Sequence, residues 1–117
     1  MKFVVVDIET TGGRPDGNGI TEIGVVHVEH RRIVHQWSTF INPEKSIPYN
    51  IQMLTGITDQ MVQDAPTFEQ VIPELLDQLK GDVFVAHSVN FDYSFIDAAF
   101  RANGVSWPNK QHSCFLS

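Results

Sequence analysis

The chain has 117 residues, of which 42% are hydrophobic, and its formal net charge at pH 7 is −6. This length allows one domain with a single core, and the apolar fraction is too high for a disordered chain. The longest apolar run near the amino terminus has four residues, so we expect neither an export signal nor a membrane-spanning segment. A single cysteine, Cys114, excludes an internal disulfide, and we therefore expect a reducing, cytoplasmic setting.

The negative charge bears on whether the chain binds nucleic acid. Phosphate groups normally bind to basic surfaces, which argues against a nucleic-acid partner. The objection disappears if several of the acids are metal ligands, because two divalent cations would add four positive charges where phosphate must lie. Composition alone leaves both interpretations open.

The amino-terminal half is predicted to form three strands. Residues 3–9 carry apolar side chains on both faces, which is typical of a strand that is covered on both sides. The glycine-rich residues 10–19 are predicted as a loop. Residues 20–28 and 33–41 are rich in β-branched and aromatic side chains and predict a hairpin, followed by an irregular segment at 42–50.

The carboxyl-terminal half is predicted to alternate helices and strands. A short helix is expected at 58–64, and a longer one at 68–79 behind the capping box Thr67-x-x-Gln70. Pro73 lies inside the longer helix and predicts a kink or a later start. A strand at 82–86, a helix from about 91 to 104 and the beginning of a strand at 111–116 complete the order. The sequence therefore predicts an α/β domain with a mixed sheet and helices on its faces, for which the ribonuclease-H-like fold is the natural candidate.

Two acids stand at the end of the first predicted strand. Asp7 and Glu9 are two residues apart, so both side chains leave the same face of the strand. Like charges this close are unfavourable unless one is protonated or a cation lies between them, and hard divalent ions take oxygen ligands. An isolated pair of this kind is more often simply solvated, so the pair gains meaning only from a third acid.

Asp92 is the candidate for that third acid. It follows the strand predicted at 82–86 and lies at the start of the next helix, where the helix dipole favours a carboxylate even without a metal. Asn90, two residues earlier, could be the N-cap of that helix rather than a functional residue.

Two segments that contain these acids resemble known motifs. Asp7-Ile8-Glu9-Thr10-Thr11-Gly12 resembles the first motif of the DEDD family of 3′→5′ exonucleases, in its DEDDh branch, which includes the proofreading epsilon subunit of bacterial DNA polymerase III. Residues 87–95, which run from His87 to Phe95, are similar to the second motif, with Ser88 where asparagine is frequent. Residues 20–24, 55–58 and 65–68 also match in order, so the resemblance covers essentially the whole chain.

The resemblance implies a two-metal mechanism with Mg²⁺ or Mn²⁺ that hydrolyses the terminal phosphodiester bond of nucleic acid. Asp7 would bridge both ions, Glu9 would bind the ion that carries the attacking water, and Asp92 would serve the other, partly through water. The implied partners are a single-stranded or frayed 3′ end, expected to be DNA, and a DNA polymerase. The residues implied to hold the terminal nucleotide are Thr10, Thr11, Gly12, Thr55, Gly56, Ile57, His87, Asn90 and Phe91. A core position in a turn explains Ile57 equally well.

The third motif of the family, His-x-x-x-x-Asp or its tyrosine variant, is not found downstream of these segments. His87 and Asp92 have the same spacing, but they belong to the second motif. No acid follows Asp97, and the residue five positions after His112 is Ser117. We therefore expect residues 1–117 to be an incomplete exonuclease domain that is nearly inactive as given. The alternatives are a nuclease of the same fold that cuts internally, and a non-catalytic module that binds nucleic acid or a polymerase. The sequence does not distinguish DNA from RNA as the substrate.

Overall fold

The computed structural model describes residues 1–86, 89–107 and 112–114, with backbone but not side chains for Val89 and 112–114. Its elements, in chain order, are β1 (Lys2–Thr10), β2 (Ile20–Glu29), β3 (Arg32–Phe40), α1 (Tyr49–Thr55), α2 (Asp59–Val62), α3 (Phe68–Gln78), β4 (Val83–Ala86), α4 (Val89–Ala102) and β5 (His112–Cys114). The strands predicted from the sequence are all present. The predicted strand at 111–116 is described only at 112–114, and its other residues lie outside the described part of the chain.

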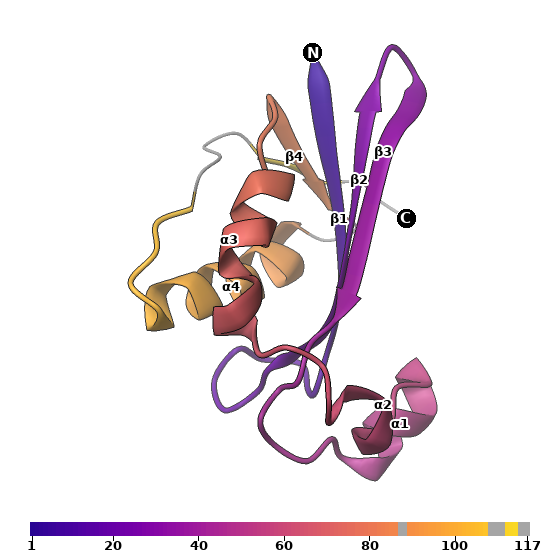
Figure 1. Ribbon diagram of the computed structural model, residues 1–117, viewed down its shortest axis with the longest axis vertical. Helices are drawn as coiled ribbons and strands as arrows, with labels where there is room; N and C mark the ends of the chain where they lie inside the picture. The colour runs from indigo at the N-terminus through magenta and orange to yellow at the C-terminus, as the bar shows by residue number, and fades with distance from the viewer. Residues whose placement is uncertain (87–88, 108–111, 115–117) are drawn as a thin grey trace.

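Within the described residues the strands form one mixed sheet in the order β3-β2-β1-β4-β5 (Figure 1). The central strand β1 is antiparallel to β2 and parallel to β4, which is in turn parallel to β5. Parallel neighbours require crossover connections, and these are right-handed because of the twist of the strands. α3 leads into β4 and α4 leads from β4 to β5, so both helices fall on the same face of the sheet.

The main core lies between that face and the two helices. Alternate residues of β1 (Val4, Val6 and Ile8) are buried against apolar side chains of α3 and α4. The residues between them face the other way, and Phe3 is 39% exposed. The prediction that β1 is covered on both sides is therefore wrong for the described part of the chain. The sequence has apolar residues on both faces, but both crossovers place their helices on one of them.

The predicted helices are present, with corrected boundaries. Thr67 and Gln70 form the expected capping box, and α3 begins at Phe68, directly after the N-cap Thr67, so Pro73 does not delay the start. α4 begins at Val89, which places Asn90 inside the helix and rules it out as the N-cap. Asp92 lies in the first turn of α4, as predicted. No helix in the described ranges combines the length and apolar character needed to cross a bilayer.

Helix α1 was not predicted. None of its residues is buried, so its sequence lacks the apolar stripe that marks a helix packed on a core. Together with α2 it lies at the end of the sheet where β1 ends (Figure 1). The carboxylate of Asp59 in α2 accepts hydrogen bonds from the backbone N–H of Ile47 (2.8 Å), from Ser46 Oγ (3.2 Å) and from Gln52 Nε2 of α1 (3.3 Å). A small second core, made of Ile47, Ile57 and Val62, lies beneath these contacts.

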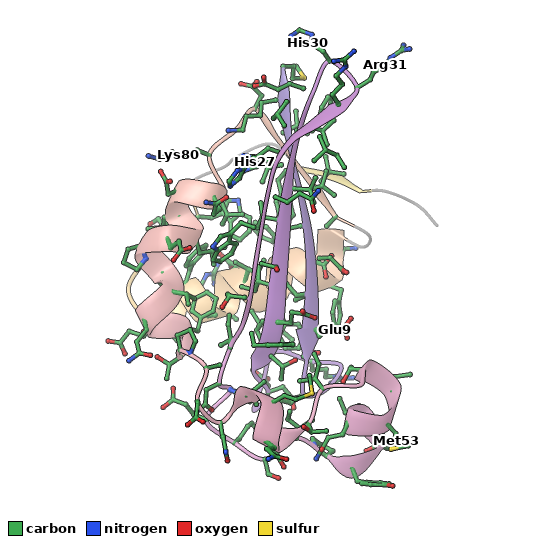
Figure 2. All side chains as sticks on the ribbon, turned by 45° about the vertical axis from the view of Figure 1, so that its right-hand side comes forward. Glu9, His27, His30, Arg31, Met53 and Lys80 are labelled. Atoms are coloured by element: carbon green, nitrogen blue, oxygen red, sulfur yellow. The ribbon has the colours of Figure 1, made fainter. Side chains whose placement is uncertain are left out.

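The β2–β3 hairpin turns at the opposite end of the sheet. Its two central residues, His30 and Arg31, have φ values of 51° and 64°, and they separate the paired residues Glu29 and Arg32. A two-residue hairpin with positive φ at both central positions has the twist of a type I′ turn. Figure 2 shows both residues far from Glu9, which lies at the end of the sheet occupied by α1.

Candidate functional site

The parallel pairing of β1 with β4 brings the two candidate motifs to one edge of the sheet. Val6 is paired with Ala86, the last residue of β4, and Asp7 comes directly after Val6. Helix α4, which carries Asp92, begins three residues after Ala86. Ligand sites in sheets of this kind lie beyond the carboxyl ends of parallel strands, and both candidate acidic segments reach that edge.

The acidic pair on β1 is arranged as expected, with one addition. Asp7 is exposed and Glu9 is half-buried on the same face, and Glu22 of β2 lies directly opposite Glu9. Burial, then Asp7, then Glu22 raise the pKa of Glu9 above its ordinary value of 4.5. Glu22, which adds to this charge repulsion, was not among the predicted site residues.

The regular pairing of β1 with β2 ends at Glu9 and Glu22. Glu9 is paired with Glu22, but the next residue, Thr10, is paired with Ile20, so Thr21 is an extra residue in β2. Bulges of this kind occur frequently beside active sites, where they redirect a strand. Alternation of residue types in the two strands could have suggested that Glu22 and Glu9 share a face, but not that they lie opposite each other.

Asp92 is buried, with 3% of its surface exposed, in the first turn of α4. Among the residues that the structure describes, no three His, Cys, Asp or Glu side chains are close enough together to hold a metal ion. The structure therefore does not show Asp7, Glu9 and Asp92 gathered around one point, and their joint role remains a prediction. The pair on β1 does fit a hard cation, because two carboxylates, which are oxygen donors, share one face of the strand.

A pocket of about 240 Å³ opens beside Glu9. It joins the end of β1 and the loop after it to α1 and to the first turn of α4. Its lining consists of Ile8, Glu9, Thr10, Gly12, Gly13, Ile51, Leu54 and Phe91. Figure 2 shows Glu9 next to the α1 segment that carries Met53. The pocket thus brings together parts of both motifs that are more than seventy residues apart in the sequence.

Some of the predicted nucleotide-binding residues line this pocket. Thr10, Gly12 and Phe91 do, whereas Thr11 is buried and is not part of the described lining. Asn90 is exposed on the first turn of α4 and is not part of the described lining, and His87 lies outside the described residues.

The predicted segment 55–57 is not part of the described lining of the pocket. Ile57 is 4% exposed and belongs to the second core, which matches the alternative explanation for it. Thr55 ends α1, and Gly56 follows with a φ of 77°. In the described residues, the α1 part of the lining is supplied by Ile51 and Leu54 instead. Neither was predicted, because the missing apolar stripe left α1 itself unrecognised.

Comparison with solved structures identifies the class of fold. A structure of exonuclease I superimposes over 98% of this chain and 28% of its own, with a TM-score of 0.84 and 15% sequence identity. Exonuclease X in complex with a 5′-overhanging duplex DNA superimposes over 96% of this chain and 58% of its own, with a TM-score of 0.75 and 28% identity. The sheet and its two helices therefore form a ribonuclease-H-like fold of the kind found in exonucleases.

Sequence comparison identifies the family. Residues 4–116 match the protein family described as Exonuclease, and the chain belongs to that family. It is 45% identical over 108 residues to the PolC-type DNA polymerase III of Caldanaerobacter subterraneus subsp. tengcongensis, and 42% identical over 110 residues to the 3′-5′ exonuclease DinG of Bacillus subtilis. The matches cover 92% and 93% of this chain, but only 8% and 12% of those relatives.

Proposed function

We propose that this chain carries part of a 3′→5′ exonuclease site that removes terminal nucleotides from DNA with the help of Mg²⁺ or Mn²⁺. The proposal rests on the position of Glu9, which belongs to two features of the site. Its carboxylate belongs to the acidic pair with Asp7, and it also lines the pocket beside that pair. A reacting phosphodiester at the pocket mouth would therefore meet the acids and the bound nucleotide together.

The roles of the acids follow the family pattern. Asp7 and Glu9 would hold one divalent ion, and Asp7 together with Asp92, from the first turn of α4, would hold a second. When bound, the ions would supply an activated water and neutralise the charge on the departing 3′ oxygen. The raised pKa of Glu9 means that a proton competes with the cation for this carboxylate more strongly than at an ordinary glutamate.

The pocket would hold the terminal nucleotide. Phe91 is half-buried and packs against Phe95 with a ring-centroid distance of 5.0 Å, which keeps an aromatic ring in the lining. Aromatic side chains stack on bases without regard to sequence. Across the pocket, Gly12 and Gly13 carry no side chains and allow sugar and phosphate to approach the backbone.

Two of the similar proteins favour DNA over RNA as the substrate. The structure of exonuclease X contains duplex DNA, and the PolC-type relative is a DNA polymerase. We propose DNA as the substrate and a polymerase, or a polymerase segment of the same polypeptide, as the partner. These partners agree with the cytoplasmic setting that the single cysteine predicts.

A non-catalytic module that binds a DNA end is the second candidate. One observation favours it: the described residues contain no group of three His, Cys, Asp or Glu side chains that could hold a metal ion. The two candidates differ in whether a bound DNA end is cut.

The deciding experiment uses the chain itself and a chimera in which it is continued by the segment that follows this region in the DinG relative. Each is incubated with Mn²⁺ and a single strand labelled at its 3′ end. Release of label by the chimera, abolished by Asp7→Asn but retained in Asp97→Asn, would support the exonuclease. Asp97 is a matched control because it lies in α4 and pairs with Arg101 at 3.0 Å.

Two other outcomes would contradict the exonuclease. Cleavage of a circular single strand, which has no end, would instead indicate a nuclease that cuts internally. Binding of the labelled strand without any release, in the chimera as well as the chain, would favour the non-catalytic module.

A further inference from the structure

Gly12 and Gly13 form part of the pocket wall, which we call the glycine wall, and they have no side chains of their own to hold it in place. A Cβ atom placed on Gly13 would meet no heavy atom within 4 Å. Glycine backbones are also the most conformationally free, so two adjacent glycines would not hold one shape without external support. The loop that contains them must therefore be fixed by contacts from elsewhere.

Asn18 supplies contacts to both sides of that loop. Its Oδ1 accepts a hydrogen bond from Thr11 Oγ1 at 2.8 Å, and its Nδ2 donates to the backbone oxygen of Arg14 at 2.8 Å. Thr11, the residue before the glycine wall, is only 1% exposed, and its Oγ1 also accepts from the N–H of Gly19 at 3.1 Å. One side chain thus joins the residues immediately before and immediately after the wall.

The side chain of Asn18 also lies directly against Gly12. A Cβ atom on Gly12 would be 2.7 Å from both Nδ2 and Oδ1 of Asn18 and 2.8 Å from its Cγ, which is closer than real Cβ atoms approach. Gly12 is not among the residues with positive φ. Glycine at this position is therefore explained by the approach of the Asn18 amide, not by an unusual backbone angle.

We infer that Asn18 is a positioning residue that holds the glycine wall in the shape that receives a nucleotide. The inference rests on the proposed function, since it takes the pocket to be a nucleotide site. Asn18 itself is not in the lining of the pocket, so its effect passes through Thr11, Arg14 and Gly12. The main core does not include this loop, so substitution of Asn18 should leave the fold intact.

The first test measures binding of thymidine 5′-monophosphate in the presence of Mn²⁺ to the 117-residue chain. Asn18→Ala should weaken binding at least about fivefold, the factor that corresponds to one net hydrogen bond. Asn103→Ala is the matched control, because it removes a single bond of the same type, from Nδ2 to the oxygen of Ala99 at 2.9 Å in α4. This control should bind like the parent chain.

The second test needs no ligand. NMR order parameters of the Gly12 and Gly13 amides should fall in Asn18→Ala and in Thr11→Val. In Thr11→Ser, which keeps the hydroxyl group, they should stay as in the parent chain. Gly12→Ala should lower the free energy of unfolding of the parent chain. It should lower it less in the Asn18→Ala variant, where the clashing atoms are absent. A double-mutant cycle measures that coupling.

The outcomes separate the inference from the proposed function. If the parent chain binds the nucleotide and Asn18→Ala binds equally well, or if the two glycines stay equally ordered, the positioning role is overturned while the proposed function stands. If the parent chain binds no nucleotide, the pocket is not a nucleotide site and both are overturned.

Discussion

The helix-covered part of the sheet and the end of the sheet that carries the pocket are held together by different kinds of contact. Beneath α3 and α4, large side chains such as Phe84, Phe100, Leu75 and Ile96 are completely buried. At the pocket end, α1 buries none of its residues, and single polar side chains, Asn18 and Asp59, join the segments that form the walls. The comparison suggests that apolar burial sets the scaffold, whereas a few hydrogen bonds set the shape of the site.

The largest expected effect concerns the chemistry of the pocket end. The 117-residue chain should release 3′ label at least about 10² to 10⁴ times more slowly than the chimera that adds a His-x-x-x-x-Asp segment, because a general base alone accounts for such a factor. Rates are compared at equal concentrations of folded protein. Equal rates would mean that a residue of the present chain, His112 first, replaces the missing group.

The next effect is on the scaffold. Phe100 is fully buried and packs edge-on against Phe68 and Trp107, at centroid distances of 5.6 and 5.5 Å. Phe100→Ala should lower the free energy of unfolding by about 3–5 kcal/mol. Urea denaturation measures it, with Tyr49→Ala as the control, since Tyr49 of α1 is 75% exposed and its loss should cost less than about 0.5 kcal/mol. Similar costs for both would erase the difference between the two regions.

A smaller loss in the free energy of unfolding is expected when a polar contact at the pocket end is removed. Asp59→Ala leaves the N–H of Ile47 without its carboxylate acceptor and should cost about 1–3 kcal/mol. Hydrogen exchange should show that the loss is local, with faster exchange at Ile47 and Gln52 and unchanged exchange in β1 and β4. Asp64→Ala, an exposed acid that follows α2, is the control. Uniformly faster exchange throughout the sheet would show that the pocket end is part of the scaffold.

The smallest effect is electrostatic. Because the pKa of Glu9 is raised in the folded state, that state binds its proton more tightly than the unfolded chain. Stability contributed by this proton is lost as the pH rises from 4.5 through the raised pKa. Glu9→Gln should therefore melt at a higher temperature than the parent chain at neutral pH, with the two converging below 4.5.

Metal binding supplies the control for this substitution. Mn²⁺ should raise the melting temperature of the parent chain, because a ligand that binds only the folded state stabilises it. It should do so less in Glu9→Gln, which lacks one of the two carboxylates. A variant that is less stable than the parent at every pH would show that Glu9 has a structural partner that outweighs its repulsion from Asp7 and Glu22.

The same contrast explains what could be predicted from the sequence. Strands β1 to β4, the capping box of α3 and the position of Asp92 in the first turn of α4 follow from local patterns of residue type, and all were predicted. α1 was not, because Tyr49, Met53 and Leu54 remain exposed and produce no periodic signal. Ile51 and Leu54, two of the described lining residues of the pocket, were therefore missed.

The pairing between segments was the other feature that could not be predicted from the sequence. The position of Glu22 opposite Glu9 depends on the register between β1 and β2, which neither strand determines by itself. The face of the sheet that the helices cover depends on the handedness of two crossovers, and apolar residues on both faces of β1 could not reveal it. Whether Asp92 joins Asp7 and Glu9 at one ion remains a prediction.

The hairpin turn at the far end of the sheet has a practical consequence. His30 and Arg31 occupy the left-handed region, which is costly for residues with a Cβ atom and natural for an Asn-Gly pair. The turn is also remote from Glu9 (Figure 2). It is therefore the place where the chain can be altered for handling, by an Asn-Gly replacement that relieves the turn or by an inserted cysteine for a dye or a surface anchor. Either change would leave the opposite end free to meet a DNA strand in a single-molecule experiment.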